Sequence, residues 1–161
     1  MSNIEKAMKY SIGLATQTME AGKGGPFGAA VLDENGEMIA LASNSVLEDH
    51  DPTAHAEVNA IRQACKVKGT HDLTGCVLIA TGYPCGMCLV SAIWANITKI
   101  YYAGEPEDCE RIGFRDAPIY EYLETGHSDE IQMEIIPASK ELRELTNQMY
   151  TKYAEDKKEM Y

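Results

Sequence analysis

The sequence predicts an α/β protein of three layers, with a mixed sheet of about five strands lying between two layers of helices. Short apolar runs alternate with longer segments in which apolar residues recur every three or four positions, as on one face of a helix. The first two apolar runs flank Asn35-Gly36, a pair typical of a tight hairpin turn. A hairpin followed by alternating strands and helices is typical of a sheet that is parallel in its later part and covered on both faces.

The first half of the chain supplies a helix, a hairpin and a second helix. Apolar residues on one face predict the first helix, which ends before Gly22; they are Ile4, Ala7, Met8, Ile12, Ala15 and Met19. Strands are predicted at 29–32 and 38–42, on either side of the hairpin turn. The second helix is predicted to open at 51–53 and to run to about Lys68, because Gly69 can take the left-handed conformation that ends helices.

The second half continues the alternation of strands and helices. A buried strand is predicted at 76–80, since 77–80 contains no polar residue. Pro84 opens a helix that ends near Asn96, and 97–103 is the next strand. The last three elements are predicted as a helix at 105–124, a strand at 131–136 and a helix at 139–157.

Composition indicates a single globular domain over residues 1–161. The chain is 45% hydrophobic and 24% charged, and no apolar run approaches the roughly 20 residues that span a bilayer. The N-terminal segment does not resemble a signal peptide, so a cytoplasmic location without a membrane partner is expected. The net charge of −11 argues against nucleic acid as a partner, because phosphate binding needs clustered Lys and Arg.

Two short segments carry the chemistry of the sequence. One contains His55 and Glu57, and the other, Pro84-Cys85-Gly86-Met87-Cys88, contains two thiols three positions apart. One imidazole and two thiolates are three zinc ligands, which leaves one position of a tetrahedral site open. The helix at 51–68 places His55 in its first turn, capped by Asp51 or Thr53. The order H-x-E then P-C-x-x-C is the signature of zinc-dependent nucleobase deaminases.

These residues have two other interpretations. C-x-x-C between a strand and a helix is also the redox motif of thioredoxin-like proteins, but here it lies past mid-chain, behind His55 and Glu57. A structural zinc site needs a fourth ligand, which Cys65, Cys76 or Cys109 would have to supply. An odd number of cysteines, five in all, argues for reduced thiols or metal ligands and against a disulfide framework.

The carboxylate of Glu57 favours a hydrolytic centre, because a structural zinc site has no use for it. Zinc lowers the pKa of water toward about 7, so that a nucleophile forms without strong base. Glu57 can take the proton of this water, pass it to a ring nitrogen and then protonate the departing amine. Glu57 is therefore predicted as the catalytic acid and base.

These residues resemble the cytidine deaminase superfamily and, within it, the bacterial guanine deaminases. The resemblance covers nearly the whole chain. Besides the two motifs, it rests on segments 24–29, 51–65, 112–116 and 157–161. It implies a cytidine deaminase-like fold, one catalytic Zn²⁺ per chain and zinc-dependent hydrolytic deamination of guanine to xanthine and ammonia.

The resemblance also implies which residues contact a nucleobase. Asn44 would donate or accept hydrogen bonds at the purine ring, Phe27 would pack near the ring, and Ala56 would border the substrate. Asp116 would meet the amino group and help to move protons. Tyr161 would complete the pocket, and segment 139–161 would be exchanged between the chains of a homodimer, so that Tyr161 serves the partner's site.

The sequence departs from the guanine deaminase pattern at a few positions. Tyr83 stands where Glu usually precedes Pro-Cys, and Arg115 and Pro118 replace more typical residues near the base-recognition segment. The identity of the substrate is therefore less firmly predicted than the type of reaction. Cytosine, a related aminated ring or guanosine remain alternatives, followed by adenosine in transfer RNA and by a zinc-binding module without turnover.

Overall fold

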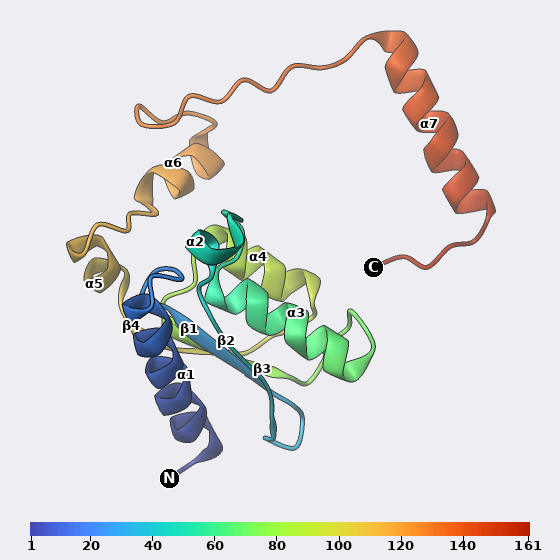
Figure 1. Cartoon of the computed structure of the whole chain (residues 1–161). Helices are drawn as coiled ribbons and strands as arrows, with labels where there is room; N and C mark the ends of the chain where they lie inside the picture. The colour runs from blue at the N-terminus through green and yellow to red at the C-terminus, as the bar shows by residue number, and fades with distance from the viewer.

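The computed structural model describes all 161 residues, and a four-stranded mixed sheet lies at its centre (Figure 1). The strands are β1 (Gly28–Leu32), β2 (Met38–Ser43), β3 (Val77–Gly82) and β4 (Ile100–Gly104), in the order β2-β1-β3-β4. β1 pairs antiparallel with both β2 and β3, whereas β3 and β4 are parallel. The predicted hairpin and the predicted parallel pairing are both confirmed.

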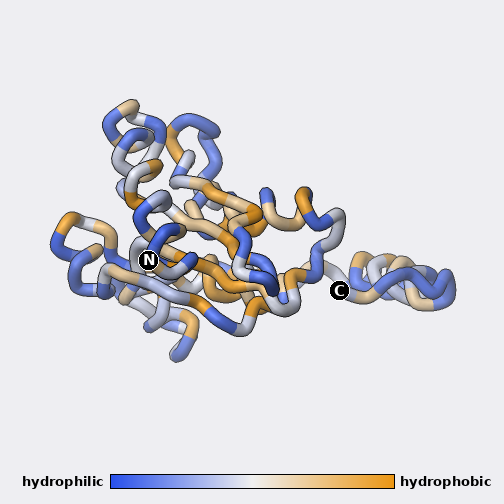
Figure 2. The backbone as a smooth tube through the Cα atoms, turned by 90° about the horizontal axis from the view of Figure 1, so that it is seen from below, coloured by the Kyte–Doolittle hydropathy of each residue, from blue (hydrophilic) through white to orange (hydrophobic).

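Helices cover the two faces of the sheet, which gives the predicted three layers. The covering helices are α1 (Asn3–Glu20) on one face, and α3 (Ala56–Lys68) and α4 (Gly86–Trp94) on the other. Side chains of β1 alternate between these layers: Ala29 and Val31 join a cluster with residues of α3, while Ala30 and Leu32 join a cluster with Ala7 of α1. Figure 2 shows segments of hydrophobic residues gathered in the middle of this body and hydrophilic segments around them.

The structure shows how the first helix begins and confirms the predicted end of the second. Ser2 caps α1 through a hydrogen bond from the Glu5 amide, and Glu5 bonds back to the Ser2 amide. Gly69 follows α3 with φ of 66°, the left-handed conformation that closes a helix. The start of α3 differs from prediction, because residues 51–55 form a turn after the short helix α2 (Val46–Asp49), and the helix begins at Ala56.

The predicted fifth strand is wrong. Residues 131–136 form no strand apart from an isolated bridge between Ser128 and Ile131. No strand pairs with the free edge of β4, and Ile135 and Ile136 are 81% and 76% exposed. An apolar run forms a strand only where backbone partners accept its hydrogen bonds, and none lies beside this segment.

The predicted helix at 105–124 is divided into α5 (Pro106–Arg111) and α6 (Ala117–Thr125). Gly113, with φ of 105°, lies in the break. Residues 112–116 therefore form an irregular segment, and this segment carries the side chains that close the candidate site described below.

The C-terminal helix α7 (Lys140–Glu155) stands apart from the rest of the chain (Figure 1). None of its residues is buried. None of the helices has the length and apolarity needed to cross a membrane.

Candidate active site

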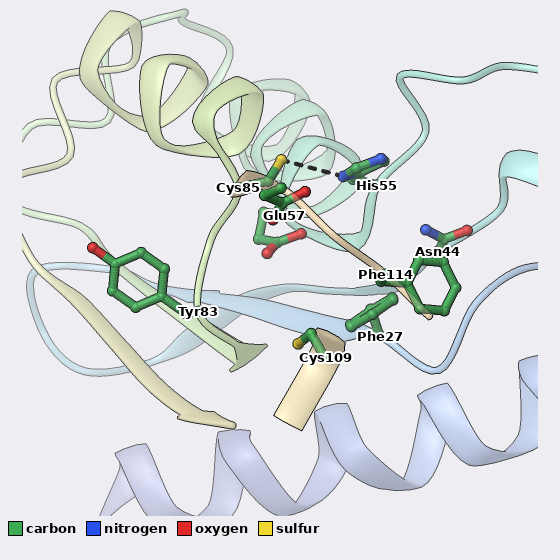
Figure 3. Close-up of a pocket in the computed structure, with 9 residues that line it drawn as sticks. Phe27, Asn44, His55, Glu57, Tyr83, Cys85, Cys109 and Phe114 are labelled. Carbon is green, nitrogen blue, oxygen red and sulfur yellow. Dashed lines mark hydrogen bonds between the residues drawn. The ribbon is translucent and has the colours of Figure 1, made fainter. Parts of the chain in front are cut away.

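The three predicted metal ligands meet where the N-termini of α3 and α4 approach each other, and Figure 3 shows two of them, His55 and Cys85, side by side. His55 is the residue that precedes α3, Cys85 precedes α4, and Cys88 lies in the first turn of α4. The prediction that Asp51 or Thr53 caps His55 within the helix is wrong, because His55 itself occupies the N-cap position. The Asp51 carboxylate instead accepts hydrogen bonds from the amide and hydroxyl of Thr53. The dipoles of both helices favour thiolates here.

The distances between the ligand atoms fit a zinc ion. His55 Nδ1 lies 3.5 Å from the Sγ of Cys85 and 3.5 Å from the Sγ of Cys88, and all three atoms lie within 4.8 Å of one another. A tetrahedral zinc with bonds of about 2.3 Å to sulfur and 2.0 Å to nitrogen holds such ligand pairs about 3.5 Å apart. The other three cysteines do not belong to this group, so the site has three protein ligands.

The ligand cluster already favours a thiolate. Hydrogen bonds from the Cys88 thiol and from His55 lower the pKa of Cys85 to about 4, because they stabilise its thiolate. The pKa of His55 is raised by its hydrogen bond with Cys85. The pKa of Cys88 is raised by its hydrogen bond with Cys85 and by its burial, since both favour the protonated thiol. The site therefore carries negative charge that a divalent cation would neutralise.

Glu57 is buried beside the ligands without belonging to the ligand set. It lies in the first turn of α3, is 8% exposed, and its Oε2 accepts a hydrogen bond from Cys88 Sγ at 3.4 Å. Burial raises the pKa of its carboxyl group, because a charge in this enclosed position loses its hydration. A buried carboxyl group with a raised pKa releases its proton less readily than an exposed one, which suits a group that must both accept and donate a proton.

A pocket opens onto this cluster and is lined by residues from five separate segments (Figure 3). Besides His55, Glu57 and Cys85, the lining residues are Phe27, Asn44, Tyr83, Cys109, Phe114 and Asp116. The rings of Phe27 and Phe114 meet edge to face, with centroids 5.0 Å apart and an angle of 85° between their planes. These two rings give the pocket an apolar wall suited to a flat ring system.

Asn44 presents the nitrogen of its amide to the pocket. The side-chain Oδ1 accepts hydrogen bonds from the amides of Gly25 and Val46, at 3.2 and 3.1 Å, and the backbone amide of Asn44 donates to the Phe27 carbonyl. Since the oxygen is already bonded to the protein, Nδ2 is the atom left to bond a ligand, and it can only donate. Asn44 is therefore built to recognise an acceptor atom.

Asp116 faces the same pocket from the start of α6. It precedes that helix, but its carboxylate bonds none of the helix amides, so the side chain is free for another partner. Partial burial raises the pKa of this carboxyl group, and the negative charge near Cys85 raises it further.

The match to a known family model decides how these observations fit together. Residues 1–104 match the model described as the cytidine and deoxycytidylate deaminase zinc-binding region. The chain belongs to this family. It is a zinc-dependent hydrolytic deaminase, and all three residues of the metal cluster lie inside the matched region.

Relatives of this deaminase include enzymes for free bases and for transfer RNA. It is 43% identical to the guanine deaminase of Bacillus subtilis over 122 residues, which are 76% of this chain and 78% of the relative. The X-ray structure of guanine deaminase from that organism matches with a TM-score of 0.79 and 37% identity, covering 91% of this chain and 93% of that chain. The tRNA-specific adenosine deaminase of Aquifex aeolicus is 40% identical over 99 residues, 62% of this chain and 64% of that enzyme.

The structure brings most of the predicted site residues of this deaminase into one pocket, but two lie elsewhere. Phe27, Asn44 and Asp116 join the metal cluster and Glu57. Ala56 is fully buried in the core cluster and does not line the pocket. Tyr161 is 81% exposed, with its ring centroid 6.0 Å from that of His71 and 6.4 Å from that of Trp94.

Three lining residues of the deaminase were not predicted to contact substrate. Tyr83 is a departure from the family pattern, and its ring packs edge to face on Tyr102 with centroids 5.0 Å apart. Phe114 belongs to the segment that carries Asp116, so the resemblance could have found it. Cys109 carries no sequence signal of its own; it reaches the pocket because α5 folds back beside the end of β3, where its Sγ lies near Gly82.

Proposed function

We propose that this deaminase converts guanine and water into xanthine and ammonia. The observation that carries the proposal is the pocket, in which a donor amide, a half-buried carboxyl group and two aromatic rings lie around the metal cluster and Glu57. The likeness to the guanine deaminases of Bacillus subtilis and Nitrosomonas europaea supports the choice of guanine; the latter structure matches with a TM-score of 0.67 and 34% identity, covering 73% of this chain and 68% of that chain.

Glu57 performs the proton transfers of the reaction. When bound to His55, Cys85 and Cys88, zinc supplies a nucleophilic water at neutral pH. The buried carboxylate of Glu57 accepts a proton from the attacking water and delivers it to the ring nitrogen next to C2, which makes that carbon more electrophilic. The carboxylate then takes up the second proton of the water, from the hydroxyl group now on C2, and gives it to the exocyclic amine, which leaves as ammonia as the C2 carbonyl forms.

Asn44, Asp116 and the aromatic pair hold the base. The Nδ2 group of Asn44 donates a hydrogen bond to an acceptor atom of the purine, since the Oδ1 of this residue is bonded to the backbone. The Asp116 carboxylate accepts a hydrogen bond from the exocyclic amino group, which is a donor bonded to the reacting carbon. The planar ring packs against Phe27 and Phe114. Together these contacts orient C2 toward the metal site.

The active enzyme is a homodimer whose two chains exchange residues 139–161. The support is the apolar face of α7, along which Leu142, Leu145, Met149 and Tyr153 recur at helical spacing while remaining exposed. Nothing within the chain covers this face. Tyr161 lies away from the pocket of its own chain, beside His71 and Trp94, which supports a role for it in the partner's site. This homodimer works in the cytoplasm, and its only other partner is the small base that it deaminates.

The proposal is tested by measuring ammonia release from the zinc-loaded full chain. The substrates are guanine, cytosine, guanosine, free adenosine and a transfer RNA with adenosine at its wobble position. We expect guanine to have the highest kcat/KM. A preference for cytosine, a nucleoside or transfer RNA would overturn the substrate assignment, and release from none of them would favour a zinc-binding module without turnover.

A further inference from the structure

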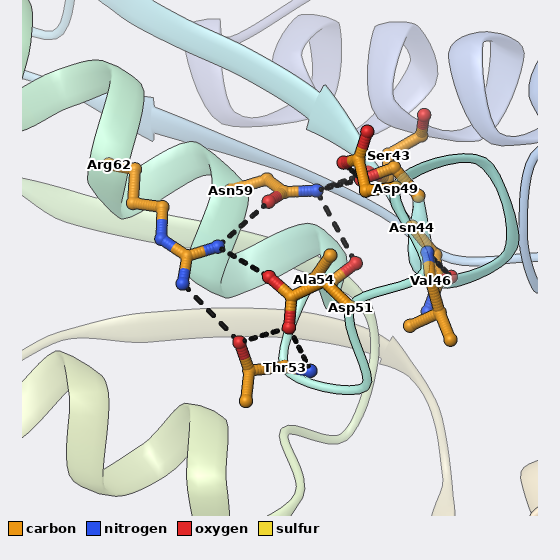
Figure 4. A network of polar contacts seen from close by, with 10 residues as sticks. Ser43, Asn44, Val46, Asp49, Asp51, Thr53, Ala54, Asn59 and Arg62 are labelled. Atoms are coloured by element: carbon orange, nitrogen blue, oxygen red, sulfur yellow. Dashed lines mark hydrogen bonds and ion pairs between the residues drawn. The ribbon is translucent and has the colours of Figure 1, made fainter.

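The side chain of Asn59 lies one helical turn after His55, on the side of α3 that faces the loop between β2 and α3 (Figure 4). Its backbone amide donates to the His55 carbonyl at 2.9 Å, so the two residues share the first turn of the helix. Asn59 does not line the pocket and touches neither the metal cluster nor the space for substrate. Any effect on the reaction must therefore pass through other residues.

The Asn59 amide nitrogen ties both ends of that loop to the helix. Its Nδ2 donates to the Ser43 carbonyl at 3.0 Å, to Ser45 Oγ at 2.9 Å and, more weakly, to the Ala54 carbonyl at 3.4 Å. Ser45 Oγ can accept this bond because its own proton is donated to Asp49. Two N–H groups thus serve three acceptors, and every donor of the amide is used.

The positions of these acceptors link the two halves of the active site. Ser43 and Ser45 are the neighbours of Asn44 on either side, and Ala54 directly precedes His55. The Ser45 amide also donates to the Ala54 carbonyl at 3.0 Å, so the two ends of the loop are joined at this point. One side chain therefore fixes the backbone that carries the base-recognising amide and the backbone that leads into a metal ligand.

We propose that Asn59 is a positioning residue that holds Asn44 and His55 at the spacing the reaction requires. The inference rests on the proposed function for the role of Asn44. A displacement of about 1 Å in a group that orients substrate can cost about 100-fold in rate. Replacing a residue that orients a metal ligand likewise changes metal affinity by about 10- to 100-fold. Losing the Asn59 amide therefore loosens both the backbone at Asn44 and the backbone that leads into His55.

The test compares Asn59→Ala with Gln63→Ala in the full-length protein. Gln63 is a matched control, because it is also an amide on α3 that bonds the backbone of β2, accepting from the Leu41 amide at 3.3 Å, but it bonds neither end of the loop. Zinc affinity is measured by chelator competition, and KM and kcat are measured with guanine. Asn59→Ala is expected to raise KM by about tenfold or more and to weaken zinc binding by about tenfold, while Gln63→Ala changes neither more than twofold.

A second variant and a double-mutant cycle separate positioning from folding. Asn59→Asp keeps the shape of the side chain but has no N–H to donate, so it should reproduce the loss if the alanine variant folds poorly. Adding Asn59→Ala to Asn44→Ala should raise KM much less than it does in the wild type, because the effect passes through Asn44. Additive effects, or equal losses in thermal stability for both α3 variants with KM and zinc affinity unchanged, would overturn the proposal. If the wild type does not deaminate guanine, the proposed function fails and zinc affinity alone decides the role of Asn59.

Discussion

Replacing Glu57 by Gln tests the catalytic assignment most directly. Glutamine has the shape of glutamate and can still accept a hydrogen bond, but its amide cannot take up or deliver a proton at neutral pH. Glu57 is not one of the three residues that surround the metal position, so the variant should keep one zinc per chain. Binding of the base should also survive, because Asn44, Asp116 and the aromatic pair are unchanged.

The size of the loss follows from the number of proton transfers that depend on this carboxyl group. A positioned general acid or base contributes about 10²- to 10⁴-fold. Glu57 acts twice as a base and twice as an acid, and no other carboxyl group lies as close to the metal ligands. We therefore expect kcat to fall by about 10⁴-fold, which corresponds to about 5 kcal/mol in the activation free energy.

Stability gives an independent check that the variant is folded. Burial raises the pKa of Glu57 above its ordinary value of 4.5, so the folded state binds more protons than the unfolded state and stability falls as pH rises above 4.5. Glutamine removes this pH-dependent cost. The zinc-free Glu57→Gln protein should consequently melt no lower than the zinc-free wild type at pH 7, and should melt higher by a margin that disappears in acid.

The assay follows guanine loss and ammonia release together with zinc content. Glu48→Gln is the control, because Glu48 lies on the nearby α2 but is half-exposed and paired with Lys23; its activity should stay within twofold of the wild type. A Glu57→Gln protein with full zinc and activity within tenfold of the wild type would refute the assigned role. Loss of zinc together with activity would show instead that the carboxylate helps to hold the metal.

The remaining predictions concern the base contacts, the metal and the tail. Asn44→Ala should raise KM for guanine by about tenfold, because one hydrogen bond is worth about 1 kcal/mol and the ring also loses its orientation; an unchanged KM contradicts this. Asp116→Asn should lower kcat by at least tenfold with zinc content unchanged, since a positioned carboxylate is lost. Dialysis against a strong chelator should abolish activity, and added Zn²⁺ should restore it. Inactive Glu57→Ala chains mixed and reassociated with Tyr161→Ala chains should regain about a quarter of wild-type activity if tails are exchanged in a C₂ dimer; no recovery means that each tail serves its own site.

The sequence predicted those parts of the fold in which a local signal and the packing agree. The hairpin turn at Asn35-Gly36 is one, because Gly36 takes the positive φ that such turns need. The end of α3 at Gly69 is another. The predicted strand at 131–136 is wrong because its apolar side chains are not buried anywhere within the chain. An apolar pattern alone does not show whether a partner strand exists. Gly113 indicated that the predicted helix at 105–124 would be interrupted, because glycine destabilises the interior of a helix.

The chemistry of the site was more predictable than its boundaries. His55, Cys85 and Cys88 carry a spacing that only metal binding explains well, and the structure brings them together. The pocket wall depends instead on how α5 returns to the sheet, which places Cys109 near Gly82. Asn59 gave no signal either, because a polar residue on a helix is usually exposed, and its three acceptors come from residues 5 to 16 positions earlier in the chain.

Apart from the hydrogen bonds of Asn59, which both parts share, the catalytic and recognition parts of this site are held by different forces, so they should respond differently to substitution. The metal ligands sit at the starts of two helices whose packing is set by small buried residues, such as Ala56 and Ala60 of α3 and Ala92 of α4. Larger side chains there would push the helices apart and separate the ligands. Asn44 and Asp116 lie on irregular segments outside the core clusters, which bend at little cost to the core. Changes in these segments should therefore alter which ring is accepted while zinc binding persists, and that is why the ring is harder to read from this sequence than the reaction.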